Sequence, residues 1–281
     1  MSGALFVFGL GFSGLEVARQ ATAAGWSVAG SVTTTDKAAR LREEGIDAVV
    51  LPFTGLGTFT HVLGTAPPRP AGDPVVAHVR SLKPSWLGYL STTGVYGDRG
   101  GAWVDEEDEP APGQPRSRNR LAAEREWQSL GVRLGVPVHV FRLPAIYGPG
   151  RSAFDQVREG RAQRIDKPGQ VFSRIHVEDL ARTVLASMAR PAPIPGAVYN
   201  VCDDDPAPQA DVIALACQLL GRPAPPLVPY DEAAGRMSDM ARSFYAENRR
   251  VRNDRIKREL GVALRYPSYR DGLRSIHARM G

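Results

Sequence analysis

The first half of the chain alternates short apolar runs with segments of helical pattern. The apolar runs lie at 4–8, 28–32, 48–51, 61–65, 86–91 and 136–143, bounded by turn residues, as is typical of strands buried on both faces. Between them, 15–24, 37–44, 75–82 and 118–130 have the composition of helices, and Gly25 and Gly45 end the first two. This alternation predicts an α/β fold with a doubly wound parallel sheet and right-handed crossovers.

The pattern changes after Gly150. Longer loops follow, with helices predicted at 177–188, 210–220, 253–260 and 269–280 and one strand at 198–202. One strand cannot form a sheet, so these helices must bury their apolar faces against the first part. We therefore predict a main domain over residues 1–150, which also takes in part of 175–203, and a smaller C-terminal part over 151–281 that does not fold alone.

Three glycines join the first predicted strand to the first predicted helix, in the pattern Gly9-x-Gly11-x-x-Gly14. The first permits a tight turn, the second lets the backbone approach a pyrophosphate, and the third allows close packing of helix on strand. The helix N-terminus also attracts anions. We predict a dinucleotide cofactor here, bound by Gly9, Gly11, Phe12, Ser13 and Gly14. The alternative is a glycine turn without a ligand.

The end of the second strand bears on the choice of cofactor. An acidic residue usually meets the ribose 2′-hydroxyl of NAD at this place, but here the strand ends in Thr33 and Thr34. With Lys37 and Arg40 just beyond, these hydroxyls tolerate a 2′-phosphate better than a carboxylate would. Asp36 lies near enough to serve NAD instead. We predict that NADP is preferred over NAD.

Four segments in this order resemble the short-chain dehydrogenases/reductases, in particular the extended and atypical members of the NAD-dependent epimerase/dehydratase family. They are Gly9-Leu-Gly-Phe-Ser-Gly14, Ser91-Thr-Thr-Gly-Val-Tyr-Gly-Asp98, Arg142-Leu-Pro-Ala-Ile-Tyr-Gly-Pro-Gly-Arg151 and Arg174-Ile-His-Val-Glu-Asp-Leu180. The resemblance extends to about residue 203 and implies a Rossmann-type dinucleotide-binding domain over 1–150 with a substrate-binding part over 151–281. It also implies a nicotinamide site near the ends of the fourth and fifth strands, with Thr65, Ala66 and Pro67 at the ribose.

The resemblance implies catalytic and substrate-binding residues as well. Thr92 stands where family members place a catalytic Ser or Thr, with Thr93 next to it as a substrate contact; the alternative is a strand-end threonine that bonds local backbone. Tyr147, Arg151 and Arg174 resemble positions beside a substrate cleft. Two arginines can hold a phosphate or carboxylate, which predicts an anionic small-molecule substrate, although surface ion pairs explain them equally well. We expect His176 to be structural.

The usual proton donor of the family is missing. Its dehydrogenases use Tyr-x-x-x-Lys on the helix after the fifth strand, and these positions correspond to Arg116 and Arg120. There is no Tyr or Lys between Tyr96 and Tyr147. Arg120 can still bind the cofactor, but a guanidinium is no general acid near neutral pH. Two possibilities remain: an oxidoreductase, epimerase or dehydratase in which Tyr147 or water handles the proton, or a non-catalytic dinucleotide-binding sensor or scaffold.

Composition adds limits to partners and location. The 281 residues, 43% hydrophobic and 23% charged, are typical of a globular protein, and no stretch predicts a membrane span or signal peptide. Cys202 and Cys217 lack the spacing of a metal site, which fits a reducing cytoplasm. From Arg236 onward Lys and Arg outnumber Asp and Glu twelve to five, but acids are interspersed, so we expect no nucleic-acid partner. We read the acidic run 105–109 as a solvated loop, predict no metal, and leave a homo-oligomer open.

Overall fold

A computed structural model describes residues 3–52, 56, 58–80, 82–190 and 196–280. Its centre is a sheet of seven parallel strands in the order β11-β7-β5-β4-β1-β2-β3. Their bounds are β1 Ala4–Phe8, β2 Ser27–Val32, β3 Asp47–Val50, β4 His61–Gly64, β5 Trp86–Thr92, β7 Val138–Leu143 and β11 Val198–Asn200. The predicted doubly wound parallel sheet is confirmed. The chain reverses direction across the sheet between β1 and β4, which is where open α/β sheets bind ligands.

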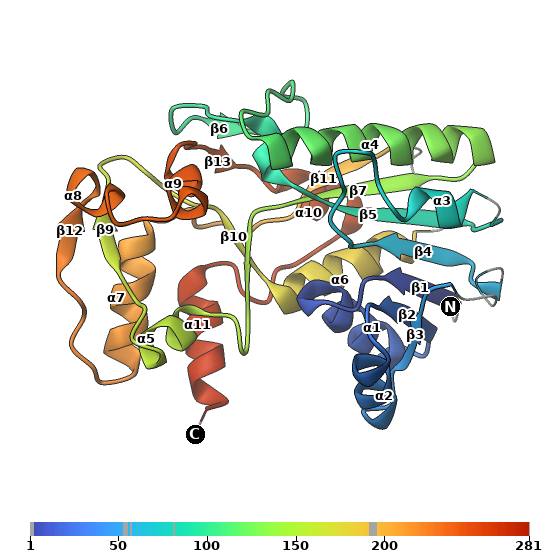
Figure 1. The fold of residues 1–281 in the computed structure, drawn as a ribbon, viewed down its shortest axis with the longest axis horizontal. Coiled ribbons are helices and arrows are strands. Elements are labelled where there is room, and N and C mark those ends of the chain that lie inside the picture. The colour runs from blue at the N-terminus through green and yellow to red at the C-terminus, as the bar shows by residue number, and fades with distance from the viewer. Residues whose placement is uncertain (1–2, 53–55, 57, 81, 191–195, 281) are drawn as a thin grey trace.

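Helices cover both faces of the sheet (Figure 1). One face carries α1 (Phe12–Ala23), α2 (Thr35–Glu43), α6 (Val177–Met188) and α10 (Asp254–Leu260), whose apolar residues share a core with Val7 and Phe141. The other carries α3 (Val76–Val79) and α4 (Pro115–Leu134), which pack on Phe8 and Tyr89. The strands alternate buried side chains to the two cores because both faces are covered.

The main sheet takes segments from beyond residue 150. β11 pairs with β7 as the outermost strand, and α6 packs beside α1. Ile256 of α10 and Val262 also lie in the core under α1 and α6. The sheet is therefore not completed until residue 200, and α10 packs against it from farther along the chain.

The rest of the C-terminal part forms its own small core beside the strand ends (Figure 1). Helices α5 (Ala153–Arg158), α7 (Gln209–Leu219) and α11 (Tyr269–Ala278) bury Phe154, Ile213 and Leu273 against one another. The sequence predicts one strand after Gly150, but several short strands occur. Of these, β9 (Arg164–Asp166) pairs with β12 (Leu227–Pro229), whereas β10 (Arg174–His176) and β13 (Arg250–Val251) pair with two short strands that precede Gly150, β8 (Ala145–Tyr147) and β6 (Trp103–Val104). Runs of two or three residues are too short to show a strand period.

Two further helices follow β12: α8 (Tyr230–Ala234) and α9 (Asp239–Tyr245). None of their residues is buried. Within the described ranges, no helix is both long and apolar enough to cross a membrane.

Candidate functional site

The glycine loop joins β1 directly to α1. Gly9 has a φ of +107°, which an L-residue rarely adopts, and a Cβ on Gly14 would lie 2.2 Å from the carbonyl oxygen of Gly9. A Cβ on Gly11 would meet no atom within 4 Å. Gly11 is also the N-cap of α1, and no side chain accepts the first helical N–H groups there. The loop is thus tightly packed at Gly9 and Gly14 and open to solvent at Gly11, as a pyrophosphate at the helix N-terminus requires.

Two hydroxyl side chains from neighbouring strands hold this loop. The Gly9 N–H donates to Ser31 Oγ at 3.1 Å, and the Leu10 N–H donates to the Ser31 carbonyl at 2.8 Å. The Thr65 hydroxyl lies 3.0 Å from the Phe8 carbonyl oxygen and 2.6 Å from that of Gly9. Thr65, predicted to line the ribose, therefore contacts the loop itself. Sequence reasoning missed Ser31, although its place at the end of β2 was a usable signal.

The end of β2 leads straight into α2. Thr33 and Thr34 are exposed, and Thr34 caps α2 by accepting the Lys37 N–H at 3.3 Å. Lys37 is half-buried, and Arg40 and Asp36 are exposed. Thr34 thus has a structural role that leaves its own hydroxyl proton available. Both a basic and an acidic side chain lie within one helical turn of it.

A cavity of about 650 Å³ opens at the carboxyl ends of β4, β5 and β7. Of the residues predicted to bind cofactor or substrate, it brings together Pro67, Thr92, Thr93, Arg120 and Arg151. Arg116, which corresponds to the tyrosine of the family's Tyr-x-x-x-Lys motif, also lines it. Glu247, Arg249, Ser243 and Phe244 line it too, from the C-terminal part. Sequence reasoning missed these four, because no local pattern in 239–251 indicates that this segment lies over the strand ends.

Thr92 ends β5 and caps the 3₁₀-helix η2 (Thr93–Tyr96). Its hydroxyl oxygen accepts the Gly94 N–H at 3.1 Å, as the local-backbone alternative expected. That bond uses a lone pair and leaves the hydroxyl proton, which has no acceptor among the described residues, free to point into the cavity. Thr93 is buried, at 4% exposed.

Arg120 reaches from α4 across the ends of β4 and β5. One guanidinium nitrogen, Nη1, donates to the Leu90 carbonyl at 2.7 Å, the Tyr89 hydroxyl at 3.1 Å and the Ala66 carbonyl at 3.4 Å. These contacts fix the side chain beside Ala66, one of the predicted ribose contacts. The remaining guanidinium N–H groups stay available to a ligand.

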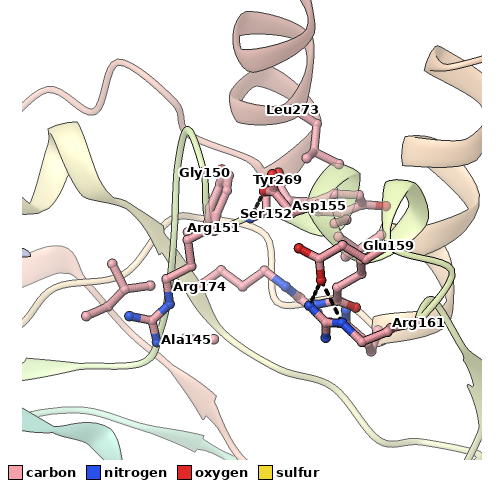
Figure 2. A pocket seen from close by; sticks show the side chains of 16 residues that line it. Ala145, Gly150, Arg151, Ser152, Asp155, Glu159, Arg161, Arg174, Tyr269 and Leu273 are labelled. Atoms are coloured by element: carbon pink, nitrogen blue, oxygen red, sulfur yellow. Dashed lines mark hydrogen bonds and ion pairs between the residues drawn. The ribbon is translucent and has the colours of Figure 1, made fainter. Parts of the chain in front are cut away.

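Tyr147 and Arg174 line a second cavity of about 300 Å³, between β8, α5 and α11, that shares Ala145, Ile146 and Arg151 with the first (Figure 2). The Tyr147 hydroxyl donates to the Ser268 carbonyl at 3.5 Å, and burial raises the pKa of Tyr147. Arg174 is 4% exposed and donates to the carbonyls of Phe172 and Ala207. Neither lines the cavity that contains Thr92. Both roles stay predictions that this geometry does not favour.

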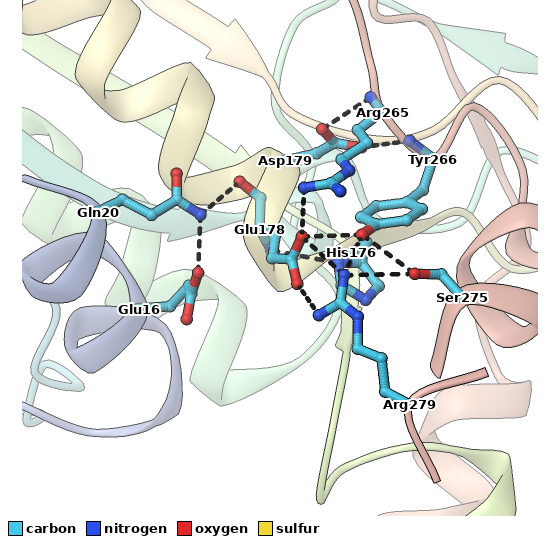
Figure 3. Close-up of polar contacts among 9 residues, drawn as sticks. All are labelled: Glu16, Gln20, His176, Glu178, Asp179, Arg265, Tyr266, Ser275 and Arg279. Carbon is cyan, nitrogen blue, oxygen red and sulfur yellow. Dashed lines mark hydrogen bonds and ion pairs between the residues drawn. The ribbon is translucent and has the colours of Figure 1, made fainter. Parts of the chain in front are cut away.

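His176 lies in a polar cluster between α6 and α11 (Figure 3). Its Nδ1 accepts the Glu178 N–H at 3.3 Å, which makes it the N-cap of α6, and its ring packs on Tyr266 at 4.1 Å between centroids. Glu178 accepts from Arg279 at 2.5 Å and from the Tyr266 hydroxyl at 2.8 Å. The cluster ties the C-terminal helix to the main domain, in agreement with a structural histidine.

The sequence predicts that the acidic run 105–109 is a solvated loop, but the structure shows that it is not wholly solvated. Glu106 is half-buried and accepts the Asn200 N–H of β11 at 2.7 Å, so it helps hold the edge strand. In the part of the chain that the structure describes, no three His, Cys, Asp or Glu side chains gather where they could hold a metal ion. The absence of a metal stays a prediction.

Comparison with known proteins shows a resemblance to one family over part of the chain. The sequence profile of the NAD dependent epimerase/dehydratase family matches residues 72–202. A functionally unknown conserved protein from Silicibacter pomeroyi is 48% identical, with 99% of each chain covered and a TM-score of 0.91.

Two further solved structures share the fold. UDP-glucuronic acid 4-epimerase from Bacillus cereus, in complex with NAD, is 17% identical over 99% of each chain, with a TM-score of 0.77. Human epimerase family protein SDR39U1, with NADPH, is 18% identical over 98% of this chain and 99% of its own, with a TM-score of 0.75. At these identities the likeness concerns the fold alone. Together with the profile match over residues 72–202, it confirms the resemblance drawn from the four motifs to the NAD-dependent epimerase/dehydratase family.

Proposed function

We propose that this protein is an NAD(P)-dependent enzyme, an oxidoreductase or epimerase, that acts on an anionic small molecule. The open space above Gly11 carries this proposal, because it adjoins the loop that β1, β2 and β4 hold in place and leaves room for a pyrophosphate. Solved structures of the same fold hold NAD or NADPH. A non-catalytic sensor or scaffold is not favoured, since the family is described by enzymatic activities.

The cofactor would extend from the glycine loop to the cavity at the strand ends. Gly9, Gly11, Phe12, Ser13 and Gly14 would hold its pyrophosphate, and Thr65, Ala66, Pro67 and Arg120 would lie at the nicotinamide ribose. We assign NADP as the preferred form, because Thr33 and Thr34 leave room for a 2′-phosphate and Lys37 and Arg40 lie within the next helical turn.

The charges lining the cavity support an anionic substrate. Glu247 pairs with Arg249 at 2.8 Å, which leaves Arg116, Arg120 and Arg151 without a carboxylate partner among the residues described. Like charges around one cavity repel each other, and an anionic ligand relieves this repulsion. Arg151 also lies over the Phe12 ring at 5.4 Å, which puts it beside the glycine loop.

Besides binding the cofactor, the side chains in the cavity would position the substrate and stabilise charge that develops on it. Bound nicotinamide supplies or accepts a hydride. Thr92, whose oxygen is held by the Gly94 N–H, would donate its hydroxyl proton in a hydrogen bond to a reacting substrate oxygen. Arg116 can stabilise negative charge there but cannot release a proton. We assign the transferred proton to water, because the Tyr147 hydroxyl lies under α11 and bonds to Ser268.

The decisive experiment is a titration with NADPH and NADH, followed by nicotinamide fluorescence, on the wild type and on Gly11→Val. Gly11 has φ −84° and ψ −163°, an extended backbone that valine tolerates, so the variant should fold with its side chain in the pyrophosphate space. We expect saturable binding, tighter for NADPH, and at least about a tenfold loss in the variant.

Gly235→Val is the matched control, because a Cβ there also meets nothing within 4 Å. It should bind NADPH as the wild type does. Absence of saturable binding of both cofactors to the wild type contradicts the proposed function, and tighter NADH binding contradicts the NADP preference.

A further inference from the structure

The first turn of α4 contacts helix α9, and Arg116 and Phe244 from these two helices line the cavity that contains Thr92. Arg116 extends from α4, with its guanidinium carbon 4.6 Å from the centre of the Phe244 ring and its Nη1 2.8 Å from Met240 Sδ. Met240 and Phe244 both belong to α9. The contact therefore joins a cation at the family's tyrosine position to two apolar side chains from the C-terminal part.

These two apolar side chains are exposed although they belong to a helix beside a cavity. Met240 is 59% exposed and Phe244 55%, and they are among the few large apolar side chains on the described surface. Phe244 lines the cavity. A helix that buries none of its residues gains little stability from packing, and these two exposed side chains leave apolar area accessible to a ligand.

Arg116 is placed to bind a ligand at the same point. It is exposed and has no carboxylate partner within the described ranges, whereas Arg249 in the same cavity is paired with Glu247. One N–H of Arg116 Nη1 points to Met240 Sδ, but a guanidinium over an aromatic ring keeps its other in-plane N–H groups accessible, and two of them match the two oxygens of a carboxylate. The part of the exposed Phe244 ring that Arg116 does not cover favours a flat apolar group.

We propose that Arg116 and Phe244 form a substrate-recognition subsite for a carboxylate attached to a planar, aromatic or conjugated body. Arg116 would pair with the carboxylate, Phe244 would stack on the flat body, and Met240 would cover it. The proposal rests on the proposed function for its place beside the nicotinamide end of the cofactor. It gives the position that lost the tyrosine a binding role in place of an acid–base one.

Calorimetric titration of the NADPH-loaded protein with 2-naphthoate tests the subsite. We expect saturable binding, about tenfold or more tighter than that of the neutral 2-naphthamide, because only the acid offers Arg116 a charged partner. Arg116→Met should remove this preference for the acid, and Phe244→Leu should weaken both compounds by about three- to tenfold. Arg125→Met, an exposed arginine on the same helix, should change neither.

Each of the other possible titration results contradicts either the subsite, the ligand class assigned to it, or the proposed function. If the protein binds NADPH but not 2-naphthoate, or if Arg116→Met keeps the preference for the acid, the subsite is wrong while the proposed function stands. If cyclohexanecarboxylate binds as tightly as 2-naphthoate, the ligand does not need a planar body. If 2-naphthyl phosphate binds more tightly than 2-naphthoate and this binding depends on Arg116, the subsite does not select a carboxylate. Failure of NADPH binding itself contradicts the proposed function, and 2-naphthoate titrated into the free protein then still tests Arg116. NADPH affinity within about twofold of the wild type shows that each variant is folded and loaded.

Discussion

His176 is a fully buried histidine whose surroundings favour its neutral form. Burial lowers its pKa from 6.5 to about 4, since desolvation outweighs the attraction of nearby Glu178. In the unfolded chain the ring takes up its proton below about 6.5, so the native state loses stability as the pH falls from there to about 4. Burial also lowers the pKa of His61, which adds a loss of the same sign.

The first prediction concerns this pH dependence. Between pH 6.5 and 4 the contribution of His176 to the free energy of unfolding should fall by about 3 kcal/mol. Urea unfolding of the wild type and His176→Asn at several pH values measures it, because the difference between the two slopes isolates this residue. Parallel pH profiles for both proteins contradict the prediction.

The second prediction tests the expectation that this chain lacks the family's tyrosine proton donor. Arg116→Tyr with Arg120→Lys places on α4, beside Thr92, the tyrosine and lysine that the family resemblance implies for these positions, and general acid catalysis is worth about 10²–10⁴-fold. With NADPH and neutral aldehydes as substrates, we expect little turnover by the wild type and a rate about 10²-fold higher for the double variant. The decrease in NADPH absorbance measures both rates.

Thr92→Val is its companion and should remove most of the restored activity. No gain in a double variant that still binds NADPH contradicts this account. Robust wild-type turnover that Tyr147→Phe abolishes would place the donor at Tyr147.

At this scale the sequence predicts residues whose chemistry follows from a motif. Gly9, Gly11 and Gly14 are recognisable because strand and helix lie directly on either side of them. Thr65 was predicted to line the ribose, yet its hydroxyl reaches the carbonyl oxygen of Gly9. That contact joins residues 56 apart, and no local pattern contains it.

Helix α4 shows how a buried ion pair sets the position of an element. Arg142 of β7 contacts Glu124 of α4 at 2.9 Å, with side-chain exposures of 6% and 2%, and the Ser91 hydroxyl donates to the same carboxylate. Glu124 stands one turn beyond Arg120, so the pair fixes the helix register that presents Arg120 to the strand ends.

The third prediction concerns a variant that removes the negative charge from the Glu124–Arg142 pair. Glu124→Gln should lower the free energy of unfolding by about 3–5 kcal/mol, because it leaves the Arg142 guanidinium buried without its counter-charge. Urea denaturation measures the loss. Glu44→Gln is the control, since its pair with Arg19 is about half exposed and should contribute less than about 1 kcal/mol. Equal losses in both variants contradict the argument.

Among the elements, those with a long period or clear stops were predictable. The strands of the main sheet and α6 lie within a few residues of their predicted ranges. Helix α1 begins at Phe12, earlier than the predicted 15, because Ser13 and Gly14 are weak helix formers whose position is set by packing. Helices α8 and α9 escaped prediction because they bury no residue and so show no apolar period.

The whole molecule consists of parts that complete one another's cores. Leu180 and Val184 of α6 and Ile256 of α10 share a core with Val7 and Val17 from the start of the chain. Gln20 of α1 donates to the Glu178 carbonyl at 3.2 Å, a contact between residues 158 apart. The chain is therefore not divided cleanly at residue 150.

The fourth prediction follows from this shared core. Residues 151–281 expressed alone should show no cooperative thermal unfolding by circular dichroism, because β11 loses its neighbour β7 and α6 loses α1. The full chain, measured in parallel, should melt cooperatively. A sharp transition in the fragment would show that the C-terminal part is an independent domain.

The late entry of β11 into the sheet also affects how the protein is made. During synthesis β7 is complete at residue 143, but the strand that covers its outer edge ends at residue 200. At about 5–20 residues per second, translation of this interval lasts roughly 3–11 seconds. For that time the nascent chain exposes an unpaired, apolar strand edge, which is a template for pairing with a neighbouring chain on the same message. The length of the segment between β7 and β11 thus sets the period in which a chaperone is most needed.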